Sequence, residues 1–320
     1  MEKDIQNFSK QFEFSPEIKN KEKWGGFQDY FLSGMGGSHL QGNVFKAIYP
    51  DFPLFLHQNY GLPLFHNGEK TGFVIASYSG NTEEVIDVYN KALSEGLSVI
   101  VISKGGHLLA DAKKKELPHI ELPQDEIEPR IAIGYSYKAL SKAVGVEKVE
   151  KEAENTVDDL MNEQPKLKQK AEELVSLLEN KIPIVYATER NRILASMWKI
   201  NFNETTKIPS FYNVIPELNH NEMTGFDVTS STKELSEKMV FVLLKDSDDY
   251  SKNRKRMGAL KKVLGERDLQ IIEVEVEGKS RTEKVFKTIL LSEWTSYLMA
   301  GFYGTNYKNS PMIENFKGMI

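Results

Sequence analysis

Short, almost continuous apolar segments, most of them followed by a segment with helical spacing, limit how this chain can fold more than any other feature. Such segments span residues 30–33, 72–77, 97–102, 119–122, 182–188, 239–244 and 269–276. Strands of this kind are buried on both faces, which is typical of parallel sheets covered by helices. The sequence therefore predicts an α/β fold with parallel sheets.

The strand and helix pattern occurs twice, separated by a Lys/Glu-rich segment with helical periodicity. With 320 residues, the chain is too long for one ordinary compact core and long enough for two domains. We expect a first domain over residues 1–145, a helical connector over 146–181 and a second domain over 182–320. Each domain is predicted to be a doubly wound αβα sandwich, and a long helix over 280–303 is expected to close the second.

The composition excludes several classes of protein. The chain has 40% hydrophobic and 27% charged residues, as ordinary globular proteins do. Its formal net charge of -5 argues against nucleic acid or an anionic membrane as partner. It has no cysteine, which excludes disulfides and thiolate nucleophiles, and no window approaches the roughly 18 apolar residues of a membrane span. We therefore expect a cytoplasmic protein that acts on a small molecule.

No metal or nucleotide cofactor is expected. The histidines lie at positions 39, 57, 66, 107, 119 and 220, and none of the spacings is typical of a metal site. Gly34 and Gly36 begin like a dinucleotide-binding fingerprint, but His39 stands where its third glycine belongs. The Gly-Lys-Ser/Thr signature of a nucleotide triphosphate loop is also missing.

Two loops of small polar residues, 36–38 and 77–82, are candidates for binding an anion. Residues of this kind more often cap helices and form turns, and for either loop alone that interpretation is favoured. Both loops, however, follow strands at the sheet edge where open α/β folds bind ligands. We therefore predict a phosphate site formed by Gly37, Ser38, Ser77, Ser79 and Thr82.

These two loops resemble those of the sugar isomerase (SIS) fold, whose five-stranded parallel sheets bind phosphosugars. Residues 201–207 (NFNETTK) and 216–222 (PELNHNE) narrow the resemblance to the bifunctional phosphoglucose/phosphomannose isomerases. The resemblance extends from about residue 32 to residue 317. It implies two SIS domains and a reversible conversion of glucose 6-phosphate to fructose 6-phosphate, with mannose 6-phosphate as a second substrate. The reaction would proceed through ring opening and a cis-enediol.

The resemblance assigns proton transfer to Glu204 and His220. Independently of the family, Glu204 continues an apolar helix face marked by Ile193, Met197 and Ile200, a setting that suits a carboxylate that moves protons between carbons. The alternative for Glu204 is a solvated acid near a helix end. His220 lies among polar residues, so its alternative is a capping or surface role.

The resemblance also implies roles for Arg130 and Lys317. Arg130 would stabilise the enediolate oxygens, whereas a surface salt bridge is its alternative. Lys317 would assist ring opening, although Ser310 replaces the usual threonine of the family's tail and residues 304–309 are atypical. The family further implies a homodimer in which each subunit lends a histidine to its partner's active site.

Two other functions remain open. A non-catalytic phosphosugar-binding regulator usually carries a DNA-binding domain, and no basic helix-turn-helix segment is visible. An isomerase that forms glucosamine 6-phosphate would need free ammonia, because the chain has no N-terminal cysteine glutaminase. Incubation with fructose 6-phosphate and detection of glucose 6-phosphate separates the three functions.

Overall fold

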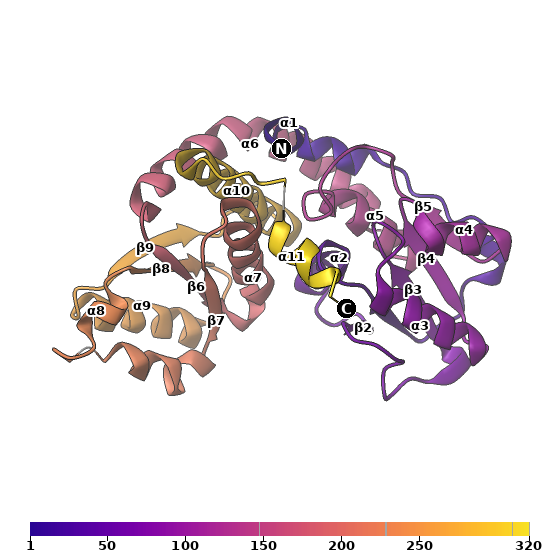
Figure 1. Ribbon diagram of the computed structural model, residues 1–320, viewed down its shortest axis with the longest axis horizontal. Coiled ribbons are helices and arrows are strands. Elements are labelled where there is room, and N and C mark those ends of the chain that lie inside the picture. Colours follow the sequence, from indigo (N-terminus) through magenta and orange to yellow (C-terminus); the bar gives the residue numbers. More distant parts are fainter. Residues whose placement is uncertain (147, 228, 309, 320) are drawn as a thin grey trace. The chain divides into compact units, whose positions relative to one another are not determined.

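The computed structural model describes residues 1–146, 148–227, 229–308 and 310–319, and the chain divides into two compact units. Unit 1 comprises residue 1 and residues 3–161, and unit 2 comprises residue 2 and residues 162–320. Each unit contains one parallel sheet flanked by helices, which confirms the predicted fold class (Figure 1). In the part of the chain that the structure describes, no helix combines the length and apolar character needed to cross a membrane.

Unit 1 is built on a five-stranded sheet in the order β2-β1-β3-β4-β5, and all its neighbouring strands run parallel. Its strands are β1 (Asp29–Ser33), β2 (Leu54–His57), β3 (Thr71–Ala76), β4 (Val99–Ser103) and β5 (His119–Glu121). Every residue of β3 and β4 is buried, which explains the unbroken apolar character of these two segments.

Helices cover both faces of this sheet. Helices α3 and α4 pack on one face against a core that includes Phe73, Ile75 and Val101, while α2 and α5 pack together on the other face (Figure 1). The helices of unit 1 are α1 (Glu2–Gln6), α2 (Gly37–Ile48), α3 (Glu83–Ser94), α4 (Gly106–Lys114) and α5 (Ile133–Ala143). The result is the predicted αβα sandwich.

Unit 2 has a four-stranded parallel sheet in the order β7-β6-β8-β9, one strand fewer than the resemblance implies. Its strands are β6 (Ile182–Thr188), β7 (Phe211–Ile215), β8 (Met239–Lys245) and β9 (Gln270–Glu275). Its helices include α7 (Arg192–Asn201), α8 (Lys233–Ser236), α9 (Ser251–Gly265), α10 (Arg281–Tyr303) and α11 (Pro311–Lys317). Helix α9 covers one face of the sheet, and the predicted closing helix, α10, packs with α7.

Helix α6 (Lys148–Leu178) lies in the predicted connector, and the boundary between the units falls inside it. The predicted domain limits at residues 145 and 182 stay predictions.

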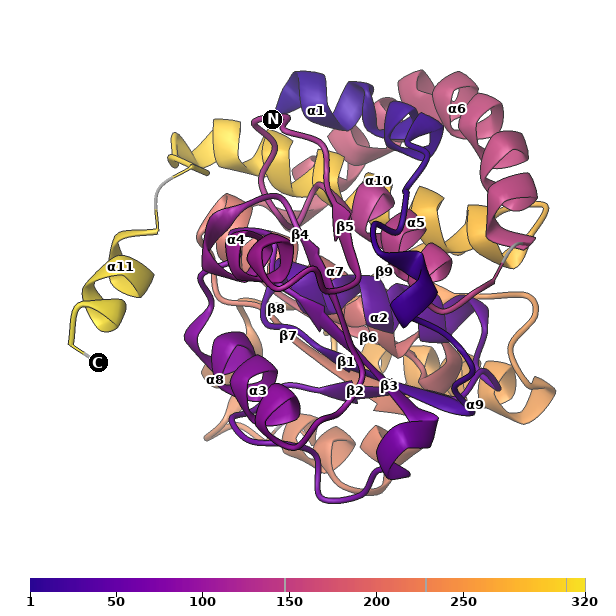
Figure 2. The same ribbon diagram turned by 90° about the vertical axis from the view of Figure 1, so that its right-hand side faces the viewer.

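At the other end of unit 2, Gly304 ends α10 in a left-handed conformation, and α11 follows beyond it (Figure 2).

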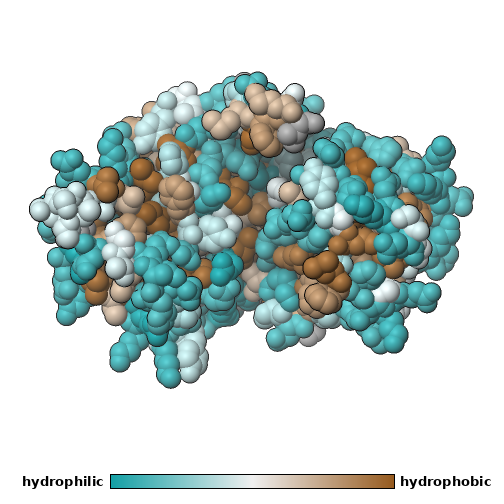
Figure 3. Space-filling view, turned by 60° about the horizontal axis from the view of Figure 1, so that its bottom comes forward, coloured by the Kyte–Doolittle hydropathy of each residue, from teal (hydrophilic) through white to brown (hydrophobic). Residues whose placement is uncertain are grey.

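Two strands, β2 and β7, were not predicted from the sequence. Both lie at sheet edges, where one side of the strand has no partner. Phe55 of β2 is 51% exposed and Phe211 of β7 is 59% exposed, so neither strand has the unbroken burial of β3 and β4. Figure 3 shows that hydrophilic side chains form most of the visible surface of one face, with apolar side chains in smaller groups.

Candidate functional site

The two predicted phosphate loops follow strands that are paired with each other. Residues 34–38 follow β1, residues 77–82 follow β3, and β1 pairs directly with β3. The next strands, β2 and β4, lie on opposite sides of this pair, so the direction in which successive strands are added to the sheet reverses here. Ligands of open α/β sheets bind outside the carboxyl ends of strands at such a switch point.

A hydrogen bond joins the two loops to each other. The Ser38 hydroxyl oxygen accepts a hydrogen bond from the backbone N–H of Tyr78 at 2.7 Å. Within the second loop, the hydroxyl oxygens of Ser77 and Thr82 lie 2.8 Å apart, while Ser79 is exposed. A hydroxyl that accepts a hydrogen bond can still donate its own proton, so Ser38 and whichever of Ser77 and Thr82 accepts from the other can donate to an anion.

Gly80 fixes the second loop by close packing. Its φ of +72° is unfavourable for other residues, and a Cβ atom there would lie 1.9 Å from the carbonyl oxygen of Gly105. The Gly80 carbonyl accepts a hydrogen bond from Leu108 N, and Asn81 Oδ1 accepts one from His107 N. The loop is therefore held against the start of α4, and Gly80 serves close approach as well as flexibility.

The backbone of Arg130 lies beside Gly37 of the first loop. A Cβ atom on Gly37 would come within 2.9 Å of the backbone nitrogen of Arg130. The Arg130 side chain is buried and lies 3.4 Å from a carboxylate oxygen of Glu128. The predicted salt-bridge alternative therefore has a partner, but the arginine is buried rather than on the open surface.

His39 is buried beneath the first loop. Burial lowers its pKa to about 4, although a hydrogen bond with the backbone of Gly34 acts in the opposite direction. The imidazole is therefore neutral at neutral pH. His39 adds no positive charge to the predicted phosphate site.

In unit 2, Glu204 lies on a π-helical turn. The sequence predicts one helix over residues 190–207, but α7 ends at Asn201 and a π turn spans Phe202–Thr206. Glu204 therefore does not lie on the regular helix face that its spacing predicts, and it is half-buried. π turns occur frequently at functional sites, because the wider turn changes the direction of its side chains.

The π turn is anchored to α10. Asn201 Nδ2 donates a hydrogen bond to the Ser292 hydroxyl at 2.7 Å, and the Thr206 hydroxyl donates one to the Ser296 carbonyl at 2.9 Å. Both partners are residues of the long, buried α10. These contacts fix the backbone on either side of Glu204.

His220 is exposed at the end of a short 3-10 turn, Glu217–His220, and Glu222 anchors the chain beside it. The Glu222 carboxylate accepts a hydrogen bond from the Tyr186 hydroxyl of β6 at 2.5 Å and a second from the Asn213 amide of β7. Burial, followed by the bond to Glu222, raises the pKa of Tyr186, so the phenol stays protonated and donates.

Sequence reasoning missed Tyr186, Asn213 and Glu222 as supports of this segment. Glu222 is the last residue of the second motif, and its partners are Tyr186 of β6, which is distant in sequence, and Asn213 of β7, the strand just before the motif. The sequence predicts the strand that contains Tyr186 but not β7, which contains Asn213, so no local pattern indicated this pair of contacts.

The tail of unit 2 starts beside the π turn. The Thr305 hydroxyl donates a hydrogen bond to the Thr206 carbonyl at 3.2 Å, and Lys207 Nζ lies 3.5 Å from the Ser310 hydroxyl. Lys317, the last residue of α11, is exposed. Of the atypical segment 304–309, residue 309 lies outside the described residues.

The structure thus brings four predicted residues together in unit 1, Gly37, Ser38, Ser77 and Thr82, with the Arg130 backbone beside Gly37. In unit 2 it ties the Glu204 segment to the start of the tail. Over residues 1–146, 148–227, 229–308 and 310–319, no group of three or more His, Asp or Glu side chains could hold a metal ion.

Replacing Gly80 by alanine is expected to lower the free energy of unfolding by about 2–5 kcal/mol, because positive φ strain adds to overpacking. The matched control is Gly61→Ala, where φ is +74° but the nearest atom to a new Cβ is Lys91 Nζ at 3.9 Å. That control should lose only about 1–2 kcal/mol. Urea unfolding measures both, and equal losses would contradict the packing role of Gly80.

Known proteins with similar sequences belong to the family that the motifs at residues 201–207 and 216–222 resemble. Residues 167–320 match the family described as the bacterial phospho-glucose isomerase C-terminal SIS domain. The chain is 30% identical over 318 residues to the bifunctional phosphoglucose/phosphomannose isomerase of Aquifex aeolicus, covering 98% of this chain and 96% of that protein. It is 31% identical over 321 residues to the enzyme of the same name from Caldicellulosiruptor bescii, covering 96% and 92%.

A solved structure supports the fold. The crystal structure of a hypothetical protein from Thermus thermophilus superimposes with a TM-score of 0.76 at 14% sequence identity. The similarity covers 98% of this chain and 86% of that chain.

Proposed function

Because the chain belongs to the family of bifunctional phosphoglucose/phosphomannose isomerases, we propose that it interconverts glucose 6-phosphate and fructose 6-phosphate. Mannose 6-phosphate is the proposed second substrate. The observation that carries this proposal is the identity of 30% over 98% of the chain. The motifs at residues 201–207 and 216–222 led to the same family from the sequence alone.

The proposed phosphate site consists of Gly37, Ser38, Ser77, Ser79 and Thr82. Its chemistry is that of neutral donors, because the hydroxyls of both loops and the first N–H groups of α3 follow β1 and β3 at the switch point of the sheet. The neutral His39 agrees with this interpretation. Hydroxyls held by hydrogen bonds to the loops lose little additional freedom when a phosphate binds.

The proposed reaction moves protons only. His220 transfers a proton from the anomeric hydroxyl to the ring oxygen, which opens the pyranose. Glu204 then removes the proton from C2 of open-chain glucose 6-phosphate while O1 gains a proton, which gives the cis-enediol. The enediol loses the proton of O2, and Glu204 returns its proton to C1 to complete fructose 6-phosphate. Arg130 balances the negative charge on the enediolate oxygens, and Lys317 assists ring opening.

The first test is an isomerase assay with fructose 6-phosphate. We expect glucose 6-phosphate to form, and Glu204→Gln to lower kcat by about 10²- to 10⁴-fold with a small change in KM, since the base acts only in the chemical step. Glu234→Gln is the control, because it neutralises an exposed carboxylate of unit 2.

Each other outcome of this assay identifies a different function. Near-normal turnover of Glu204→Gln would contradict the assignment of the base. Binding without turnover in the unsubstituted protein would favour the regulator. Formation of glucosamine 6-phosphate that depends on added ammonia would favour the aminating isomerase.

The proposed assembly is a homodimer in which His220 of one chain serves the site that contains Glu204 of the other. The exposure of His220 on a turn anchored by Glu222 supports this proposal. An isologous dimer places the same turn on each partner symmetrically.

Mixed dimers test the shared site. Glu204→Gln and His220→Asn chains are unfolded together and refolded, so that in a mixed dimer one site inherits both lesions and the other neither. Statistical mixing should restore about one quarter of the activity of the unsubstituted protein, since about half the dimers are mixed and each has one intact site. Persistent inactivity, with mixed dimers detected by native mass spectrometry, would contradict the shared site.

A further inference from the structure

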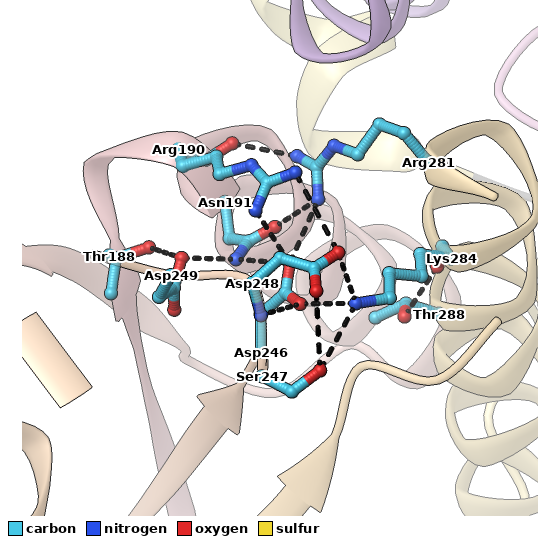
Figure 4. A network of polar contacts seen from close by, with 10 residues as sticks. All are labelled: Thr188, Arg190, Asn191, Asp246, Ser247, Asp248, Asp249, Arg281, Lys284 and Thr288. Atoms are coloured by element: carbon cyan, nitrogen blue, oxygen red, sulfur yellow. Dashed lines mark hydrogen bonds and ion pairs between the residues drawn. The ribbon is translucent and has the colours of Figure 1, made fainter. Parts of the chain in front are cut away.

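The sheet of unit 2 has its own switch point, to which the proposed function assigns no role. The strand order places β7 and β8 on opposite sides of β6, so the segments after β6 and β8 flank this point. The equivalent position in unit 1, after β1 and β3, carries the two hydroxyl-rich loops. In unit 2, charged side chains lie there instead (Figure 4).

Three cations converge on two carboxylates at this position (Figure 4). Lys284 Nζ lies 2.6 Å from an oxygen of Asp246 and 2.7 Å from an oxygen of Asp248. Arg281 Nη1 lies 3.2 Å from Asp246. Arg190 lies at the edge of the group, with its Nη atoms 3.8 Å from Asp246 and 3.9 Å from Asp248.

The two carboxylates differ in how firmly they are held. The Asp246 side chain is fully buried and also accepts hydrogen bonds from Asn191 and from the backbone N–H of Asp248. Burial alone would raise the pKa of Asp246, but the hydrogen bonds from Lys284, Asp248 N and Asn191 outweigh it and lower the pKa. Asp246 is therefore a fixed anion of the fold.

Asp248, in contrast, is 54% exposed. Its close contacts are Lys284 and a 3.5 Å approach to the Ser247 hydroxyl, and Arg190 is farther away. An ion pair with an exposed partner contributes little to stability. The Asp248 carboxylate can therefore leave its position while Asp246 and its contacts stay in place.

With Asp248 displaced, this group of side chains keeps its three cations, Arg190, Arg281 and Lys284, and the two carboxylates of Asp246 and Asp249. Burial raises the pKa of Asp249, which accepts hydrogen bonds from Thr188 and Asn191. Positive charge is then in excess. The N-terminus of α10 adds little, because Ser280 already caps it by accepting a hydrogen bond from Glu283 N.

A cavity of about 490 Å³ is lined by two of these cations, Arg281 and Lys284, and by Asp248 itself. Glu275 and Glu277 also line it, but Lys245 lies 2.7 Å from Glu275 and Lys170 lies 3.9 Å from Glu277. The volume is within the range of about 300–1,000 Å³ that is common for small-molecule sites. The lining side chains that carry N–H or O–H groups are Ser247, Lys279, Ser280, Arg281 and Lys284.

We propose that the switch point of unit 2 is a second phosphate-binding site, which the carboxylate of Asp248 closes in the absence of ligand. A phosphate group, free or carried by a sugar, displaces Asp248 and takes its place against Lys284, Arg281 and Arg190. The site goes beyond the proposed isomerase activity and uses none of its catalytic residues.

Isothermal titration of the full chain with inorganic phosphate at low ionic strength tests this proposal. Asp248→Asn removes the internal competitor and should tighten phosphate binding by at least about fivefold. Asp51→Asn is the matched control, because it removes the same charge from an exposed position of unit 1. Adding Arg190→Gln to Asp248→Asn should abolish this gain in phosphate affinity. Equal affinities of the Asp248→Asn and Asp51→Asn proteins would overturn the proposal.

A second measurement covers the case in which Asp248→Asn does not fold. The unsubstituted chain should bind phosphate in two phases, and Arg190→Gln should lose the weaker phase while the other phase is unchanged. A single phase that Arg190→Gln does not alter would overturn the proposal. A parallel titration with glucose 6-phosphate identifies the source of the phosphate group: tighter binding in the Arg190-dependent phase indicates a sugar phosphate, and equal binding indicates free phosphate.

Discussion

The parallel pairing of β1 with β3 is the constraint on which the candidate phosphate site depends. Because both strands point in the same direction, the loops that follow them leave the sheet at one edge. The hydrogen bond from Tyr78 N to the Ser38 hydroxyl then joins the two loops. The close packing of Gly80 against the carbonyl of Gly105 holds the second loop against the start of α4. The hydroxyls are thus positioned by the sheet before any ligand arrives.

The same constraint has a different chemical result in unit 2. The pairing of β6 with β8 brings Arg190 and Asp246 to one edge, where ion pairs stand in place of hydroxyls. The proposed proton-transfer groups lie elsewhere in this unit, Glu204 on the π turn after α7 and His220 on the turn after β7. Similar sheets therefore carry neutral donors in one unit and charged groups in the other.

Much of the fold could be predicted because buried parallel strands leave a continuous apolar signature. The edge strands β2 and β7 left no such signature, since Phe55 and Phe211 face solvent. The π turn could not be predicted either, because helical periodicity continues through residues 193–204 while the backbone changes its hydrogen bonding at Phe202. Glu204 and His220 were found by resemblance of motifs, whereas the role of Glu222 depends on tertiary contacts that no local pattern contains.

The central claim is that the chain moves a proton between two carbons of a phosphosugar through an enediol. The most direct measurement is to hold glucose 6-phosphate at equilibrium with the protein in D₂O for many turnovers and to locate deuterium by NMR. Deuterium should enter C2 of glucose 6-phosphate and C1 of fructose 6-phosphate, because the proton on a carboxylate base exchanges with solvent. Interconversion of the two sugars with no deuterium in either would mean direct hydrogen transfer between the carbons and would contradict the claim.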